Sequence, residues 1–268
     1  MDHDPVARIQ TLPAIALRGL TVFPNVLIHF DVGRAASIKA MEAAMAAGEP
    51  VFLVGQKDMT VERPERDDLY TVGTLSNVRQ ILRMPGDNVR VMVEGISRAR
   101  LRDVTQREPY LMAEIEAIPE EKAGRASAKT EALMRSTYEM FQNYTELAPK
   151  ISPDLLINVL ASDDPGYIAD YIAQNIAMRN SDKQAILEEL RPVRRLERLY
   201  RLLTREVEIL GLDMEIQNRA REQMADNQRD YYLREQMKAI QAELGEGEGG
   251  GDSEIGDYRK KIAEAKLP

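Results

Sequence analysis

Apolar and polar residues alternate near the start of the chain in the way that half-buried β-strands require. The clearest case is residues 26–32, where the even positions are valine, isoleucine, phenylalanine and valine. His29 stands among the polar positions of this run. We therefore expect it to be a surface residue and not a catalytic base, since no partner motif accompanies it.

The neighbouring segments predict a small, mostly-β domain. Residues 51–54 are continuously apolar, which is typical of an interior strand. Residues 37–47 carry one apolar helical face, which Gly48 is expected to end. The cluster at 84–88 is rich in turn-forming residues and lies between two β-rich runs, so it predicts a hairpin. The expected architecture of residues 1–118 is a barrel-like or sandwich-like sheet with one helix.

The hydrophobic period changes to that of helices after a polar connector at 119–124. Ser152 and Asp164 are expected N-cap residues, and each is followed by a proline at the first helical position, where proline is favoured. Ser181–Gln184 has the form of a capping box. Such short helices are marginal alone. They predict a helical bundle at residues 125–212, and the fold class is α+β.

A single long helix is predicted over residues 193–244. This stretch has no proline and only one glycine, Gly211, and at ~1.5 Å per residue it would be roughly 78 Å long. Its first half is apolar on one face, whereas the part beyond about residue 213 is mostly polar. We expect that part to be a projecting arm. A helical hairpin broken at Gly211 is the alternative.

The last residues differ in composition from everything before them. Residues 245–257 are rich in glycine and acidic residues, which predicts a flexible linker. A new helical pattern begins at 258–268 and stops, so we expect another domain to follow it.

Composition excludes several kinds of chemistry. The chain of 268 residues has no cysteine and only two histidines, which excludes disulfides, thiolate metal sites and a cysteine nucleophile. Its net charge of −8 disfavours a general nucleic-acid partner, because proteins that bind nucleic acid need many exposed Lys and Arg side chains to neutralise phosphates. No apolar run approaches the length of a membrane span, and the acidic start lacks the features of a signal peptide. These observations predict a cytoplasmic protein without a membrane partner.

Three further signals have two interpretations each. Asp163 and Asp164 resemble an acidic site, but their position before Pro165 favours helix capping. The thirteen methionines could fill the core or form an adaptable binding surface, and the pattern leaves this open. Arginines at the start of the long helix could meet an anionic partner, although a solvated face is the favoured interpretation. These arginines are Arg191, Arg195, Arg198 and Arg205.

Several stretches carry a resemblance to a known family. They are residues 12–38, 72–101 and 223–245, and the most specific segment is QRDYYLREQMKAIQ at 228–241. With these stretches the chain resembles the N-terminal region of bacterial Lon-type ATP-dependent proteases over nearly its whole length.

The resemblance implies a recognition and coupling module. In that family the N-terminal parts capture unfolded, misfolded or degron-bearing polypeptides, and the long helix leads to an AAA+ ATPase ring and a serine protease domain with a Ser-Lys dyad. ATP, Mg and a homohexamer are implied for the full-length protein, which acts in protein quality control and stress responses. Residues 1–268 lack a G-x-x-x-x-G-K-[ST] phosphate loop, so we expect no enzyme activity, catalytic residue, cofactor or metal within them.

Two loops are candidates for substrate binding, because a module that captures unfolded chains needs apolar groups held in water on a rigid support. The residues predicted to point outward are Val22, Phe23, Pro24, Met84 and Pro85. The alternative is that Phe23 closes the core of the sheet and only Met84 is exposed.

The predicted function is therefore substrate recognition and assembly for an ATP-dependent protease, with unfolded proteins and further copies of the chain as partners. The alternative is a free-standing adaptor or RNA-binding protein with a small β domain. The acidic balance disfavours RNA.

Overall fold

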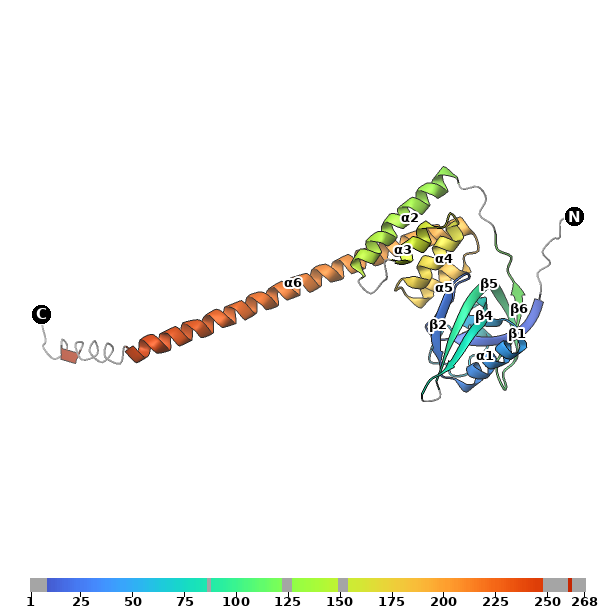
Figure 1. Cartoon of the computed structure of the whole chain (residues 1–268), viewed down its shortest axis with the longest axis horizontal. Helices are drawn as coiled ribbons and strands as arrows, with labels where there is room; N and C mark the ends of the chain where they lie inside the picture. The colour runs from blue at the N-terminus through green and yellow to red at the C-terminus, as the bar shows by residue number, and fades with distance from the viewer. Residues whose placement is uncertain (1–8, 86–87, 122–126, 149–153, 248–259, 262–268) are drawn as a thin grey trace. The chain divides into compact units, whose positions relative to one another are not determined.

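The computed structural model in Figure 1 describes residues 9–85, 88–121, 127–148, 154–247 and 260–261. The chain divides into two units, Met1–Leu210 and Gly211–Pro268. The boundary between them falls inside the last long helix. The finer boundaries predicted near residues 118 and 125 stay a prediction.

A six-stranded sheet forms the β-rich part of the first unit, and it curls into a ring (Figure 1). The strands are β1 (Ile9–Leu17), β2 (Leu27–Val32), β3 (Val51–Gly55), β4 (Val72–Arg83), β5 (Val89–Gln106) and β6 (Met112–Ala117). Their order is β2-β5-β4-β3-β1-β6, and β6 pairs with β5 as well as with β1. This second pairing closes the ring because β5, with 18 residues, is long enough to pair with β2 near its start and β6 near its end. The predicted barrel-like sheet is confirmed.

The alternation predicted for residues 26–32 is present in the structure. Val26 and Val32 are buried, and His29 is exposed on the outer face of β2. Helix α1 (Ala35–Ala47) packs on the sheet and ends at Gly48, whose φ of +66° lies in the left-handed region that glycine tolerates best. Both expectations follow from local physics, and both are confirmed.

The second half of the first unit is helical. It contains α2 (Ala128–Leu147), α3 (Asp154–Leu160), α4 (Pro165–Asn175), α5 (Asn180–Glu188) and the start of α6 (Pro192–Gly247), and a short 3₁₀ turn, η1 (Arg66–Asp68), lies between β3 and β4. One apolar core joins these helices to the sheet, because it contains Phe23, Val26 and Val72 together with residues of α2 to α6. The β-rich and helical parts are therefore packed as one body.

The predicted helix starts have different outcomes. Asp164 caps α4 as expected, with its Oδ1 accepting the N–H of Gly166 at 2.8 Å. The prediction of a capping box at Ser181–Gln184 is wrong, because α5 begins at Asn180. The side-chain amide of Gln184 donates instead to the carbonyl oxygen of Val72 at 2.9 Å. A hydrogen bond between the helices and the sheet thus takes the place of the expected capping hydrogen bond within α5. Ser152 lies outside the described residues.

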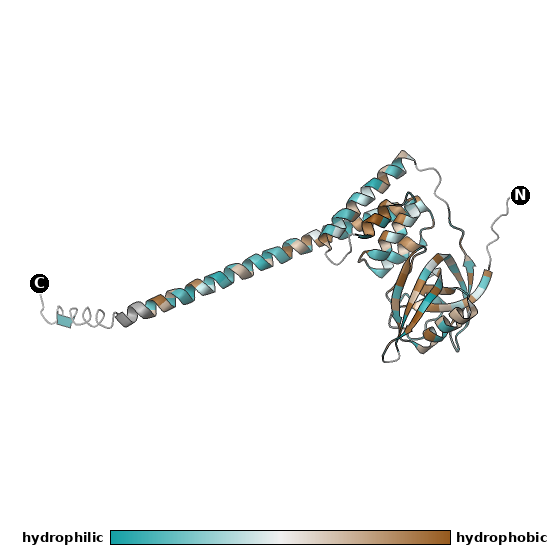
Figure 2. Ribbon diagram, in the orientation of Figure 1, coloured by the Kyte–Doolittle hydropathy of each residue, from teal (hydrophilic) through white to brown (hydrophobic). Residues whose placement is uncertain are grey.

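Helix α6 is continuous from Pro192 to Gly247 and passes through Gly211 without a break. The predicted single helix is confirmed, and the hairpin alternative is wrong. Leu196, Leu199 and Leu203 are fully buried, whereas every residue from 212 to 242 is exposed. Figure 2 shows that α6 also changes in hydropathy along its length. Its later turns are mainly hydrophilic, with isolated hydrophobic residues.

We expect amide hydrogens in residues 213–242 to exchange much faster than those in residues 130–205. Helices in water draw most of their stability from burying an apolar face, and the second unit buries none of its described side chains from 212 to 242. Hydrogen-exchange mass spectrometry on the whole chain measures both regions together. Equal protection of the two regions would contradict this and would indicate that the exposed helix packs against a second copy.

Candidate functional site

The loop before β2, predicted to bind substrate, lies inside the apolar core. Phe23 is 0% exposed, and Val22 and Pro24 are also buried. The backbone N–H of Phe23 donates to Oε1 of Gln174 in α4 at 3.2 Å, and the carbonyl of Val22 accepts the Thr74 hydroxyl at 2.6 Å. The expectation that Val22, Phe23 and Pro24 point outward is therefore wrong. The helices supply the surface on which this loop packs, and strand alternation alone contains no information about them.

A glycine on β5 allows the loop to lie so close to the sheet. A Cβ atom built on Gly95 would meet the carbonyl oxygen of Phe23 at 2.2 Å, well inside contact distance. The backbone of Gly95 also exchanges hydrogen bonds with the turn, donating to Val26 and accepting from Asn25. The residue at 95 must therefore be glycine for Phe23 to reach the helices, because even the Cβ of alanine would collide with the backbone of the loop.

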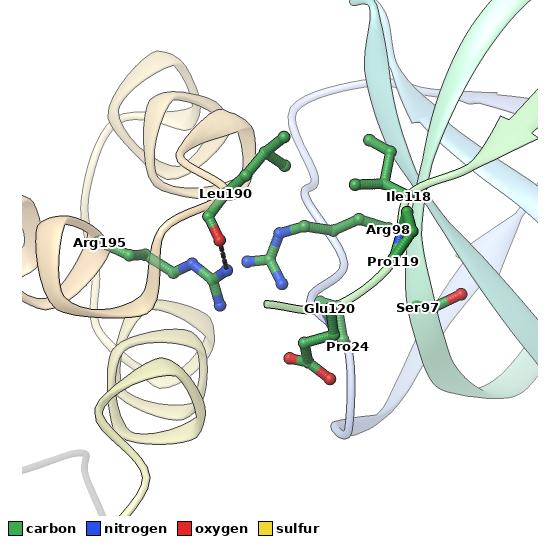
Figure 3. A pocket seen from close by; sticks show the side chains of 8 residues that line it. All are labelled: Pro24, Ser97, Arg98, Ile118, Pro119, Glu120, Leu190 and Arg195. Carbon is green, nitrogen blue, oxygen red and sulfur yellow. Dashed lines mark hydrogen bonds between the residues drawn. The ribbon is translucent and has the colours of Figure 1, made fainter. Parts of the chain in front are cut away.

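A buried ion triad lies next to this loop, at the junction of the sheet and the helices. Asp170 of α4 accepts from Arg98 of β5 at 2.7 Å through Oδ1 and from Arg195 of α6 at 2.8 Å through Oδ2. All three side chains are at least nine-tenths buried. Figure 3 shows the two guanidinium groups approaching each other from opposite sides, with Glu120 of the connector beside them.

The environment of Arg195 explains how two cations share one carboxylate. Burial lowers the pKa of the Arg195 guanidinium, and the negative charges of Asp170, Glu120 and Asp164 oppose that effect. Arg195 also donates to the carbonyl oxygens of Glu189 and Leu190. The prediction of a solvated arginine face is thus wrong for Arg195, which is 1% exposed and holds the helices against the sheet.

Further polar contacts hold the same junction. The hydroxyl of Thr21 donates to Oδ1 of Asn180 at 2.8 Å, and the Nζ of Lys183 donates to the carbonyl of Gln174 at 3.1 Å. Burial lowers the pKa of Lys183 to about 8, because removal from water disfavours the charged amine. Together with the triad, these contacts make the junction a structural element and not an accessible site.

The second predicted loop is accessible. Strands β4 and β5 form the expected hairpin, closed by a hydrogen bond from the Met84 N–H to the Asn88 carbonyl at 2.9 Å. Leu82 and Met84 are 46% and 40% exposed, and Pro85 is exposed as well. We call Leu82, Met84 and Pro85 the hairpin patch. Phe23 is not part of it, so the structure separates the two loops that the sequence suggested as one surface.

The described ranges contain neither a candidate metal centre nor a candidate membrane span. No group of three or more His, Asp or Glu residues in the described ranges is arranged to hold a metal ion. His29 is exposed and lies beside Leu82 at a small hollow on the outer face of the sheet. Among the helices that the structure describes, none combines the length and apolar character needed to cross a membrane.

The described fold has counterparts among known proteins. The N-terminal domain of a Mycobacterium avium complex Lon protease covers 73% of this chain with 98% of its own length, at a TM-score of 0.59 and 17% identity. A Lon N-terminal domain protein from Xanthomonas campestris covers 71% of this chain with 96% of its own length, at a TM-score of 0.52 and 16% identity. The ring-like sheet followed by helices is thus the fold of Lon N-terminal domains.

Sequence comparison identifies the family. The family model described as the ATP-dependent protease La (LON) substrate-binding domain matches residues 11–205, so the chain belongs to this family. Proteins named Lon protease from Heliobacterium modesticaldum and Clostridioides difficile are 43% and 41% identical to it over 260 residues each. These alignments cover 97% and 96% of this chain but only 32% and 33% of the relatives. The predicted resemblance is confirmed, and the chain spans about a third of the length of these proteases.

The sequence contained no signal for the ion triad. Its three members are 72 and 25 residues apart along the chain, and each belongs to a different element. The sequence shows only that apolar residues recur at helical spacing around Arg195. An arginine side chain next to an apolar helix face normally extends into solvent. The spacing of the elements in three dimensions decides the pairing.

Proposed function

We propose that this chain binds unfolded polypeptides as the substrate-recognition part of an ATP-dependent protease. The observation that carries the proposal is the family match, because the matched residues 11–205 span nearly all of the first unit. The model that matches describes a substrate-binding domain and not a catalytic one.

The hairpin patch is the surface that we propose for this binding. Unfolded chains expose apolar side chains, and a binding site for them must hold apolar groups in water without collapsing. The patch lies at the end of two paired strands, so its backbone is held by the sheet while its side chains stay exposed. Met84 adds a flexible, polarizable side chain that can adapt to different sequences. Val22, Phe23 and Pro24 are left out of the site because they are buried.

We further propose that α6 couples the binding unit to an ATPase ring in the full-length protein. That ring would require ATP and Mg, and a homohexamer and a cytoplasmic location accompany it in this proposal. The support is the chain's similarity to Lon proteases and the exposed apolar residues of α6, which offer contacts to other copies or domains. Recognition of specific degrons belongs to the same proposal.

Replacing Leu82 and Met84 by serine is expected to weaken the binding of an unfolded polypeptide by at least about tenfold. Each fully buried apolar side chain contributes about 1.5–3 kcal/mol, so two that become buried on binding account for this loss. Fluorescence anisotropy with a labelled, permanently unfolded protein measures the dissociation constant. Both side chains are exposed, so the melting temperature should change little.

Met59→Ser is the matched control, since Met59 is 58% exposed and lies on a different loop. Its binding should equal that of the unchanged chain. Normal binding by the double variant would remove the hairpin patch from the proposal. The exposed Ile157 and Leu160 of α3 would then be the next residues to replace.

A further inference from the structure

We infer that the free edge of β2 binds a segment of unfolded polypeptide as an added β-strand. The inference rests on the proposed function and deepens it, because it gives the bound polypeptide a conformation and a second place of contact. The edge consists of the outward-facing backbone groups of Leu27, His29 and Asp31. The partner that fits them is an extended polypeptide segment without proline, since such a segment presents its own N–H and C=O groups at the same spacing.

Strand β2 has only one neighbour in the sheet. Each of the other described strands pairs with at least two strands, whereas β2 pairs with β5 alone. Figure 1 shows β2 at the outer margin of the sheet. Among the described elements, only β5 runs along it. One side of the β2 backbone is therefore left without a partner strand.

The hydrogen bonds around β2 show which of its residues face the open side. The carbonyl oxygen of Val26 accepts the N–H of Gly95, so it faces β5. On β5, the carbonyl oxygen of Asn88 accepts the N–H of Met84, so it faces β4 and not β2. Backbone groups alternate in direction along a strand. Both observations therefore make the even-numbered residues of β2 bond to β5 and the odd-numbered residues point outward.

Leu27, His29 and Asp31 accordingly direct their backbone N–H and C=O groups away from β5. Within the described ranges, these groups have no hydrogen-bond partner. All three residues are exposed, and Leu27 is 59% exposed. Water therefore reaches a row of donors and acceptors at the spacing of a strand, which is the arrangement that an incoming extended chain pairs with.

The edge of β2 lacks the features that normally prevent strand addition. Natural proteins protect such edges with lysine, with proline or with a covering segment. The six residues of β2 include neither lysine nor proline. Their one acidic side chain, Asp31, is paired with Arg90 of β5 at 2.7 Å, so its charge is compensated within the sheet. The edge is thus open to an added strand.

A partly apolar hollow beside this edge offers room for a side chain of the added strand. It has a volume of about 420 Å³ and lies between the end of β1 and the end of β2. The apolar residues that line it are Ile15, Leu17, Leu20, Phe30 and Val32. Alternate side chains of an added strand point to the same face of the sheet as Phe30. One of them can therefore enter the hollow while the backbone pairs with β2.

A second copy of the chain fits this edge poorly. Two β2 strands paired antiparallel about His29 would place Leu27 of one copy opposite Asp31 of the other. An apolar side chain opposite a carboxylate gains neither close packing nor a hydrogen bond. An unfolded polypeptide offers many segments, and one with an apolar side chain at the right position satisfies both the edge and the hollow.

The edge and the hairpin patch lie at the same end of the sheet. Val32 of β2 is opposite Val89 of β5, and Val89 is opposite Arg83, which precedes Met84 of the hairpin patch. A polypeptide paired with β2 can thus continue to the patch. Backbone hydrogen bonds are the same for every sequence, so the edge gives affinity without sequence preference, whereas the patch adds apolar contact.

Hydrogen exchange resolved by residue with NMR tests the inference on the unchanged chain. The probe is a ten-residue peptide with a lysine at each end and alternating valine and threonine between them. In the free chain the amides of Leu27, His29 and Asp31 should exchange fast, since they bond only to water. Bound peptide should slow their exchange by at least about tenfold. Unchanged exchange of these three amides while the peptide is bound would overturn the inference.

Two variants of one residue isolate the backbone from the side chain. His29→Pro and His29→Ala both remove the imidazole, but only alanine keeps the N–H. Edge strands accept proline where the N–H faces solvent. We expect His29→Pro to bind the peptide at least about tenfold more weakly than His29→Ala by fluorescence anisotropy. Equal binding by the two variants would contradict the inference. Circular dichroism shows whether both are folded, and if His29→Pro is not, the exchange measurement decides.

A modified peptide makes the same comparison from the side of the ligand. It has the same side chains but carries N-methyl groups on two adjacent central residues, so each of its edges loses an N–H. We expect it to bind the unchanged chain at least about tenfold more weakly than the unmodified peptide. Equal binding would mean that side chains alone hold the peptide, and the inference would be wrong.

The outcomes distinguish this inference from the proposed function. If the permanently unfolded protein binds while the outward amides of β2 keep their fast exchange, the inference is wrong and the proposed function stands. If these amides become protected without any peptide as the protein concentration rises, β2 pairs with a second copy, and the inference is again wrong. Failure of the unfolded protein to bind at all would count against the proposed function itself.

Discussion

Replacing Asp170 by asparagine is expected to lower the free energy of unfolding by about 3–5 kcal/mol. The substitution keeps the size of the side chain but removes the only carboxylate that bonds to both Arg98 and Arg195 in the described structure. Two guanidinium groups would then stay buried near each other without their shared counterion. Denaturation by urea, followed by circular dichroism, measures the loss.

Asp163→Asn is the control for this experiment. Asp163 is exposed and lies just before α4, so the same chemical change there should alter the free energy of unfolding by no more than about 0.5 kcal/mol. A loss below about 1 kcal/mol for Asp170→Asn would contradict this prediction, because the two buried guanidinium groups would then not depend on the Asp170 carboxylate. The triad would then contribute little to holding the sheet against the helices.

Replacing Phe23 by alanine is expected to destabilise the first unit by about 3–5 kcal/mol. Phe23 is fully buried in the core that joins the sheet to the helices, and its removal leaves a cavity between them. For a unit of this size, 1 kcal/mol corresponds to roughly 2–4 °C in melting temperature. Thermal melting should therefore show a decrease of several degrees.

Met84→Ala and Phe23→Leu complete the comparison. Met84 is on the hairpin patch, so its truncation should change the free energy of unfolding by at most about 0.5 kcal/mol. Phe23→Leu keeps much of the buried volume, and it should bind unfolded polypeptide as the unchanged chain does. Weakened binding by a stable Phe23→Leu variant would falsify the assignment of Phe23 to the core alone.

Asp170→Asn and Phe23→Ala both act on the junction between the sheet and the helices. Asp170 belongs to a helix and Phe23 to the loop before β2, yet both hold the sheet and the helices together. Their effects should not add independently if the junction opens as a whole.

The local elements of this protein could be predicted from the sequence because their determinants are local. Strand β2 has a strict alternation, α1 stops at a glycine, and Asp164 precedes Pro165 at the start of α4. Each of these patterns depends on residues a few positions apart, where the backbone geometry is already known. The continuity of α6 through Gly211 follows similarly, since one glycine costs only about 1 kcal/mol in a helix.

Only the tertiary structure decided which side chains are exposed to solvent and which are buried. Phe23 and Arg195 were expected outside and are inside, because the atoms that cover them come from elements far away in the sequence. Gln184 gives up a local cap for a bond to Val72, which is 112 residues away. Apolar period and capping motifs thus determine the helices and strands, whereas packing between the sheet and the helices decides burial and ion pairing. That packing depends on distances between elements, which no local pattern encodes.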